Sequence, residues 1–454
     1  MEDTTRRLGE EKISKLLWQF SLPSIIGTLA SSVYVIIDRI FVGQVVGPDA
    51  LAGLSVTMPI SFIILAFGLL VGVGSGALVS IRLGQGKREE AENILGNAFT
   101  LVLIISVVVS GLLLFYLERL LTLFGASQAI LPYAKNFIGI ILFASFFQYT
   151  GFGLSNIIRA EGNPRKAMYV VLINAGTNIV LDIVFILWLG WGVRGAAIAT
   201  VISQGVSAAI VLYHFCYRSN LRLRLVNMRL HPNLVRTIFS IGMAPFAMQL
   251  AASVVNTLFN QNLAQYGGDP AIGAFGVIGS ILNFLILPVI GINMGSQPII
   301  GFNYGARHYD RVIETLKDAI IAATAVTTAG FVLLELFPGQ MLGAFTNDAA
   351  IIKIGTHGMR LIILMLPVVG FQIVCGNLFQ AIGKGRLALL LALLRQVVIL
   401  IPALMILPRL WQLNGIWISG PIADGLATMI TLLILLPEIR SLRNQHEVLP
   451  RENV

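Results

Sequence analysis

The chain has 454 residues, of which 56% are hydrophobic and 12% are charged, about half the charged share of an ordinary soluble domain. This composition excludes a soluble domain and indicates a polytopic helical protein of the lipid bilayer. The net charge of +9 is typical of basic membrane loops and does not call for nucleic acid as a partner. Cys216 and Cys375 lie far apart and form no CxxC, so no disulfide framework is expected.

Apolar runs recur along the whole chain, and each is long enough to cross a hydrocarbon core of about 30 Å as a helix. The first twenty residues mix acids and bases and lack a small-residue cleavage site, so we expect no removable signal peptide. Glycine, proline and charged residues divide the runs into twelve predicted spans: 15–44, 50–82, 89–117, 129–160, 165–189, 194–217, 233–263, 270–303, 309–338, 350–381, 386–408 and 414–438.

The longest loop predicts a division into two halves. It has the sequence YRSNLRLRLVNMRLHP and separates the sixth span from the seventh. We therefore expect an N-lobe over 1–217, a cytoplasmic linker over 218–232 and a C-lobe over 233–454.

The distribution of basic residues tests the number of spans. With the N-terminus inside, 23 of the 31 Lys and Arg residues fall on the inner side and only 6 on the outer side. A wrong number of spans would destroy this bias. Twelve spans with both termini in the cytoplasm are predicted.

The two halves resemble each other. A displacement of 221 positions superposes Gly47 on Gly268, Gly74 on Gly295 and Asn156 on Asn377, among other pairs. Because each half has an even number of spans, the repeats are parallel. Two such lobes around a central cavity are typical of an alternating-access transporter, although a channel is an alternative that parallel repeats alone do not exclude.

Two acidic residues lie inside predicted spans, where an ionised carboxylate costs about 3 kcal/mol or more. Asp38 precedes Gly47 by nine residues, and Asp182 precedes Gly190 by eight. Since both spans rise in the same direction, the two carboxyl groups are expected at one depth in the outer half of the N-lobe.

Polar residues follow the same helices at helical spacing. Asn174 and Asn178 share a stripe with Asp182 on the fifth span, and Thr200, Ser203 and Gln204 form a stripe on the sixth. Together with the two acids, these oxygen-bearing groups predict a site for a proton or a small hard cation such as Na⁺. A polar network that only packs helices is the alternative.

The second half lacks this cluster. The positions equivalent to Asp38, Asn178 and Asp182 hold Phe259, Ile399 and Ala403. Cation coupling is therefore expected of the N-lobe alone. Arg395 and Asp424 remain inside C-lobe spans, either as a structural ion pair or as substrate contacts.

The chain resembles the multidrug and toxic compound extrusion (MATE) transporters, in the bacterial and archaeal branch with an acid on the first helix. The resemblance extends over essentially the whole chain and is carried by these motifs: IDRIFVG, GPDALAGLSVTMP, IIRAEGNPRKAM, NIVLDIVFI and GVRGAAIATVISQG. It implies export of cationic or amphipathic drugs in exchange for H⁺ or Na⁺, by a monomer in the inner membrane of a prokaryote with no further cofactor.

Family residues map onto individual positions. The resemblance implies a cation site at Asp38, Asn178, Asp182 and Thr200, and a hinge in the first helix at Pro23. Proline independently removes a helical hydrogen bond there, although an ordinary kink is an equal alternative. We add Tyr34, one turn before Asp38, as a further candidate. Arg39, beside the acid, departs from the plain apolar position expected.

Two other functions are considered. A flippase for lipid-linked sugars or another lipid precursor would be expected to carry several cationic residues for a pyrophosphate, and only Arg395 and Arg39 are assigned to neither side of the membrane. An enzyme is not expected, since the chain contains no HExxH, GxSxG or P-loop motif.

Overall fold

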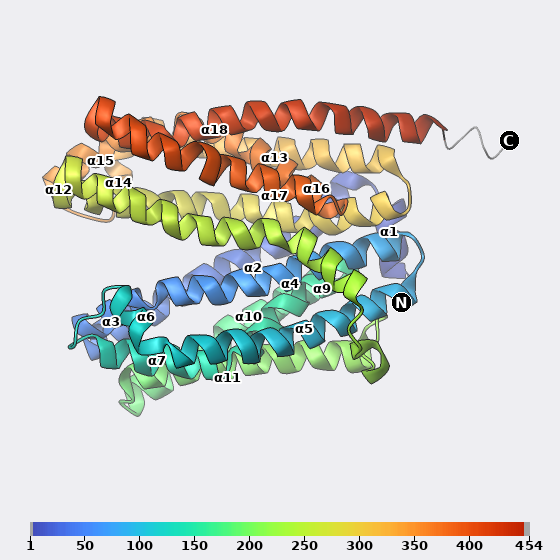
Figure 1. Ribbon diagram of the computed structural model, residues 1–454, viewed down its shortest axis with the longest axis horizontal. Helices are drawn as coiled ribbons and strands as arrows, with labels where there is room; N and C mark the ends of the chain where they lie inside the picture. The colour runs from blue at the N-terminus through green and yellow to red at the C-terminus, as the bar shows by residue number, and fades with distance from the viewer. Residues whose placement is uncertain (1–2, 449–454) are drawn as a thin grey trace.

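The computed structural model describes residues 3–448 and consists of helices over that range. Two helical lobes lie side by side, with the first half of the chain in one and the second half in the other, and both ends of the chain emerge at the same end of the bundle (Figure 1). We call this the terminal end. The ranges expected for the two lobes begin and end in 1–2 and 449–454, which lie outside the described residues.

The N-lobe is built from α2 to α11 with short π-helical turns between them. Its elements are α2 (Ile13–Phe41), η1 (Val42–Val46), α3 (Pro48–Val56), α4 (Met58–Gly84), α5 (Arg88–Phe115), α6 (Leu117–Leu123), α7 (Leu131–Phe143), α8 (Ser145–Gln148), η2 (Tyr149–Gly153), α9 (Leu154–Ala160), α10 (Pro164–Asp182), η3 (Ile183–Trp188), α11 (Gly192–Tyr213) and η4 (His214–Arg218).

The C-lobe contains two very long helices. Its elements are α12 (Pro232–Gly305), α13 (Tyr309–Leu336), α14 (Pro338–Gly343), α15 (Ala349–Ile362), α16 (Leu366–Ala381), α17 (Gly385–Leu393), η6 (Leu394–Leu400) and α18 (Ile401–Val448). The short helix α1 (Asp3–Glu10) precedes the N-lobe, and the 3-10 turn η5 (Leu225–Met228) lies between the lobes in sequence.

The twelve predicted crossings are recovered when the two longest helical stretches are divided at their internal breaks and each bent helix pair is counted as one crossing. Eight continuous helical stretches of the described chain are long and apolar enough to cross a bilayer, and two pairs bent by 60° and 53° supply two more. The 74-residue α12 is too long for one crossing, and it turns back at Gly268, whose φ of 67° favours glycine. The stretch 385–445 breaks likewise at Trp411 and Gln412.

The lobes meet through glycine at the terminal end. A side chain at Gly84 on α4 would collide with the Phe302 carbonyl of α12, and one at Gly305 on α12 would collide with the Ile81 carbonyl of α4. Gly84 and Gly305 are equivalent positions of the two repeats. The two backbones therefore touch directly, and we call this contact the glycine seam.

Helix α2 packs against both lobes, on α10 of the N-lobe and on α12 of the C-lobe. On the C-lobe side, a Cβ at Gly295 would lie 2.7 Å from the Ser21 nitrogen, and one at Gly291 would lie 2.7 Å from the Ile25 nitrogen. Pro23 lies between these two contacts, and α2 continues through it without interruption. The terminal half of α2 is thus packed on the C-lobe backbone.

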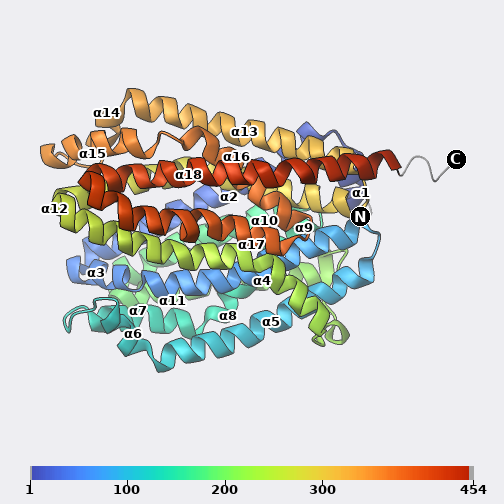
Figure 2. The ribbon, with the colours of Figure 1, turned by 45° about the horizontal axis from the view of Figure 1, so that its top comes forward.

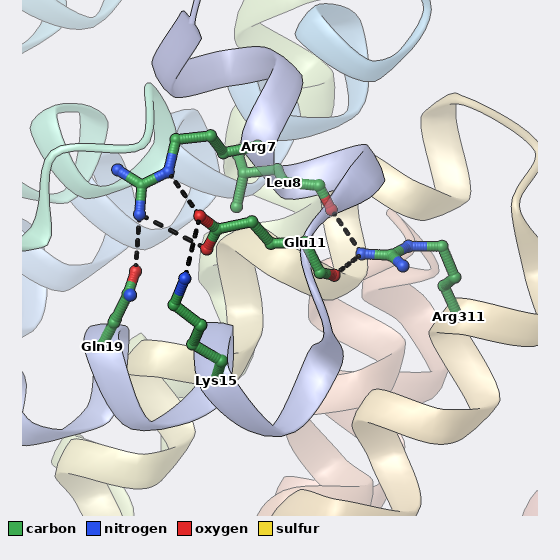
Figure 3. Close-up of polar contacts among 6 residues, drawn as sticks. All are labelled: Arg7, Leu8, Glu11, Lys15, Gln19 and Arg311. Atoms are coloured by element: carbon green, nitrogen blue, oxygen red, sulfur yellow. Dashed lines mark hydrogen bonds and ion pairs between the residues drawn. The ribbon is translucent and has the colours of Figure 1, made fainter.

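The segment that leads from α1 into α2 is also tied to the C-lobe by hydrogen bonds (Figure 3). Arg311 of α13 donates from Nη2 to the carbonyl oxygens of Leu8, at 3.1 Å, and Glu11, at 2.6 Å. Arg7 donates to the Glu11 carboxylate and, at 2.8 Å, to Gln19 Oε1. The hydrogen bond from Arg7 holds the pKa of Glu11 below its ordinary value, so this pair persists at neutral pH and is lost as the pH falls through that lowered pKa.

The chain between the lobes is fixed to the N-lobe and is not a free tether. Thr100 Oγ1 donates to the Met228 carbonyl at 2.7 Å, and Asn97 Nδ2 donates to the Arg229 carbonyl at 3.1 Å. The His231 backbone N–H donates to Asn97 Oδ1 at 2.8 Å. The chain from η5 to the start of α12 is therefore attached to α5.

The glycine seam generates a stability prediction. Gly305→Ala should lower the stability of the protein by about 1–3 kcal/mol, because the added methyl group forces α4 and α12 apart. Gly111→Ala is the matched control, since nothing lies within 4 Å of a Cβ at Gly111. The check is the thermal unfolding midpoint of the purified protein in detergent, and equal midpoints for the two variants would contradict a tight seam.

Candidate functional site

The structure brings the predicted acids of the N-lobe together. Asp38 on α2 is 8% exposed, and Asp182, the last residue of α10, is fully buried. The two carboxyl groups are close enough for their charges to interact, and Tyr34 lies within the electrostatic reach of both. Two facing helices thus present two acids to a common buried region.

The neighbouring amide and hydroxyl come from α10 and α11. Asn178 is fully buried and donates from Nδ2 to Thr200 Oγ1 at 3.4 Å. Thr200 in turn donates to the Ala196 carbonyl at 3.0 Å, which fixes the direction of its hydroxyl. The Asn178 carbonyl oxygen is consequently turned away from Thr200 and is free to accept or to coordinate.

The buried oxygens of this site lack donors. Asp38 Oδ1, both Asp182 carboxylate oxygens and Asn178 Oδ1 have no hydrogen-bond partner among the described residues. Buried polar atoms are almost always satisfied, and a set of buried acceptors without donors is an arrangement that a positively charged ligand would satisfy. Carboxylate and amide oxygens are hard ligands that fit a proton or Na⁺.

The backbone departs from the α-helix within about one turn after each acid. Helix α2 passes into the π-helical turn η1 at Val42, four residues after Asp38, and α10 passes into η3 at Ile183, one residue after Asp182. Such turns are rare and are frequent at functional sites. Gly43 lies within η1 but does not by itself predict a π-helical turn, and η3 contains neither glycine nor proline.

The remaining candidates lie around this pair in different ways. Asn174 and Gln204 each have one buried side-chain oxygen without a partner. Ser203 is buried and donates to the Thr200 carbonyl at 2.9 Å, so its hydroxyl proton is directed to the backbone. Arg39 is directed to α4, where Nη2 lies 3.4 Å from Met58 Sδ.

The candidate pair of the C-lobe forms an ion pair. Arg395 Nε of η6 donates to Asp424 Oδ1 of α18, and the Asp424 side chain is 9% exposed. The charge of each group is therefore compensated by the other. In contrast to the N-lobe acids, this pair has no unmet need for a cation.

Two buried residues of the N-lobe interior were not singled out from the sequence. Tyr149 and Thr150 are fully buried at η2, and their hydroxyl oxygens have no partner. The neighbouring Gly151 packs on α11 beside Ser207 and the Gln204 carbonyl. The polar stretch QYTG inside an apolar span was the signal that could have identified them.

A two-lobed bundle of twelve crossings with a buried acid pair in one lobe defines a polytopic transporter of the MATE type. The MatE family model matches the chain twice, over 23–184 and over 245–406. The chain belongs to the MATE family. The two matches cover equivalent parts of the two repeats.

Known relatives and structures agree with this assignment. The multidrug export protein MepA of Staphylococcus aureus (strain MRSA252) is 28% identical over 93% of both chains, and that of Staphylococcus haemolyticus is 27% identical over 96% of this chain and 95% of its own. The structure of the MATE multidrug transporter DinF-BH in complex with R6G is 37% identical, with a TM-score of 0.88 over 94% of this chain and 96% of the other.

The environments of Asp182 and Asp424 predict opposite effects of the same substitution. Asp182→Asn should leave stability unchanged or raise it, because the carboxylate it removes has no donors. Asp424→Asn should lower stability by about 1–3 kcal/mol, because it leaves Arg395 without its charged partner. The expected loss is at the low end for a buried ion pair, because 32% of the Arg395 side chain is exposed to solvent. Thermal unfolding midpoints of both variants provide the check, and a larger fall for Asp182→Asn than for Asp424→Asn would contradict this difference.

Proposed function

We propose that the protein is a multidrug efflux antiporter, which exports cationic or amphipathic organic compounds in exchange for H⁺ or Na⁺. The observation that carries this proposal is the buried, donor-free acid pair Asp38 and Asp182 on α2 and α10. Membership of the MATE family and the similarity to proteins named for multidrug export support the choice of cargo.

The proposed mechanism uses α2 as the link between the cation site and the lobes. Asp38 belongs to the acid pair of the N-lobe, whereas Ser21 and Ile25 of the same helix pack on the C-lobe backbone. Neutralising the acid pair with a cation changes how the outer half of α2 packs on α10. Pro23, which removes one backbone hydrogen bond of α2 between its two C-lobe contacts, is the proposed hinge.

Exchange follows if cation and drug favour opposite arrangements of the lobes. A cation entering the cell down its gradient then supplies energy for drug export, and each elementary charge contributes about 2.3 kcal/mol per 100 mV of membrane potential. The lipid-flippase alternative has less support, because the charge of Arg395 is compensated by Asp424.

We further propose that the terminal end faces the cytoplasm of a prokaryotic cell and that the transporter acts in the inner membrane as a monomer. The support is the excess of Lys and Arg on the loops of that side. The linker with its four arginines, Arg222, Arg224, Arg229 and Arg218, lies at this end.

Transport in proteoliposomes tests the acid pair. Ethidium efflux should be driven by a Na⁺ gradient, a pH gradient or both, and Asp38→Asn should reduce the driven rate at least about tenfold, because the pair can no longer release and rebind a cation. Asp49→Asn, an exposed acid on α3, is the matched control and should transport normally. Equal driven efflux by Asp38→Asn and the parent would refute the proposed mechanism.

The native cysteines test the orientation. Cys216 is exposed near the terminal end, whereas Cys375 is buried. A membrane-impermeant maleimide should label the protein in inside-out vesicles and not in intact spheroplasts, and Cys216→Ser should abolish the labelling. Labelling in spheroplasts with none in inside-out vesicles would reverse the orientation.

A further inference from the structure

A small polar pocket lies between the lobes, away from the acid pair. The N-lobe contributes Gly76 and Ser80 of α4 and Asn156, Arg159 and Ala160 of α9, and the C-lobe contributes Met294, Gln297 and Pro298 of α12. We call it the seam pocket, because it lies on the same two helices as the glycine seam: Ser80 precedes Gly84 by four residues, and Gln297 precedes Gly305 by eight.

The charge of the seam pocket is not compensated. The Arg159 side chain is 92% buried by its neighbours, being only 8% exposed. Its Nη2 donates to Asn156 Oδ1 at 2.7 Å, which is a neutral acceptor. Among the described residues no carboxylate lies within ion-pair distance of Arg159, and Glu161, its near neighbour in sequence, is engaged by His214, Ser219 and Asn163. A buried guanidinium normally has an anionic partner.

The opposite wall of the pocket also presents a donor. Gln297 Nε2 is buried and has no hydrogen-bond partner. The hydroxyl of Ser80 donates to the Gly76 carbonyl at 3.1 Å, and Asn156 Nδ2 donates to the Phe152 and Gly153 carbonyls, so the donor groups of these two residues are already used within the N-lobe. The pocket therefore combines one net positive charge with an unused N–H group and no acid.

The repeat symmetry shows that this charge is specific to one lobe. Arg159 is equivalent to Gln380 in the C-lobe, and Asn156 is equivalent to Asn377. Asn377 donates to the Asn293 carbonyl at 3.1 Å and makes a neutral contact with Ser296. The equivalent position of the C-lobe is thus satisfied by neutral hydrogen bonds within that lobe. Helix packing at this position therefore does not require an arginine.

We propose that the seam pocket binds a small inorganic anion, of which chloride is the abundant example, between Arg159 and Gln297. The pocket has room for about one water-sized sphere, which favours a single small ion over an organic acid or a lipid headgroup. Because the two donors belong to different lobes, the bound anion adds an attraction that holds the terminal end closed.

The test is binding measured through stability, which needs no transport activity and is independent of the proposed antiport. The thermal unfolding midpoint of the purified full-length protein should be about 2–5 °C higher in sodium chloride than in sodium gluconate at equal ionic strength. Arg159→Gln should abolish this difference, whereas Arg218→Gln, a matched change at an exposed arginine, should retain it.

Gln297→Glu is the decisive second variant, because it places a carboxylate in the pocket as a built-in partner for Arg159. It should show no difference between chloride and gluconate, while its midpoint in gluconate should equal or exceed that of the parent. The proposal is overturned if the parent responds equally to both salts, or if Arg159→Gln or Gln297→Glu retains the chloride response.

Discussion

The direct contact between the backbones of α4 and α12 is the constraint on which the arrangement of the two lobes depends. Glycine at Gly84 and Gly305 allows each helix to approach the carbonyl groups of the other without an intervening side chain. Such close packing is the main source of helix association in lipid, where the hydrophobic effect contributes little. The lobes are thus held together at the terminal end, and the ribbons of α3 and α15 lie well apart at the other (Figures 1 and 2).

The two lobes differ in how the charges of their buried acids are compensated. The N-lobe keeps acceptors without donors at Asp38 and Asp182, whereas the C-lobe has matched its acid, Asp424, with Arg395. A buried acid pair without hydrogen-bond donors lowers stability but can bind a cation. An acid that forms an ion pair with arginine has its charge compensated and lacks that capacity. Helix α2 links the N-lobe acid pair to the C-lobe, since it carries Asp38 at one end and packs on the C-lobe at the other.

The sequence predicted the spans, the repeat and the acid cluster because each depends on spacing along one chain. Period-four spacing places Asn178 and Asp182 on one face of a helix, and the structure brings that face to Asp38 and Thr200. Spacing does not report how a helix is rotated against its neighbours. The uncompensated Arg159, the carbonyl partners of Arg311 and the π-helical turns after the two acids therefore became visible only in three dimensions.

The attachment of η5 to α5 has a mechanical consequence. Since Thr100 and Asn97 hold the chain as far as His231, the next residue, Pro232, already begins α12. Further along the same helix, a side chain at Gly242 would collide with the Leu70 carbonyl of α4. The start of α12 is therefore attached to the N-lobe both through the chain and through close packing, so a relative rotation of the lobes has to accommodate this attachment.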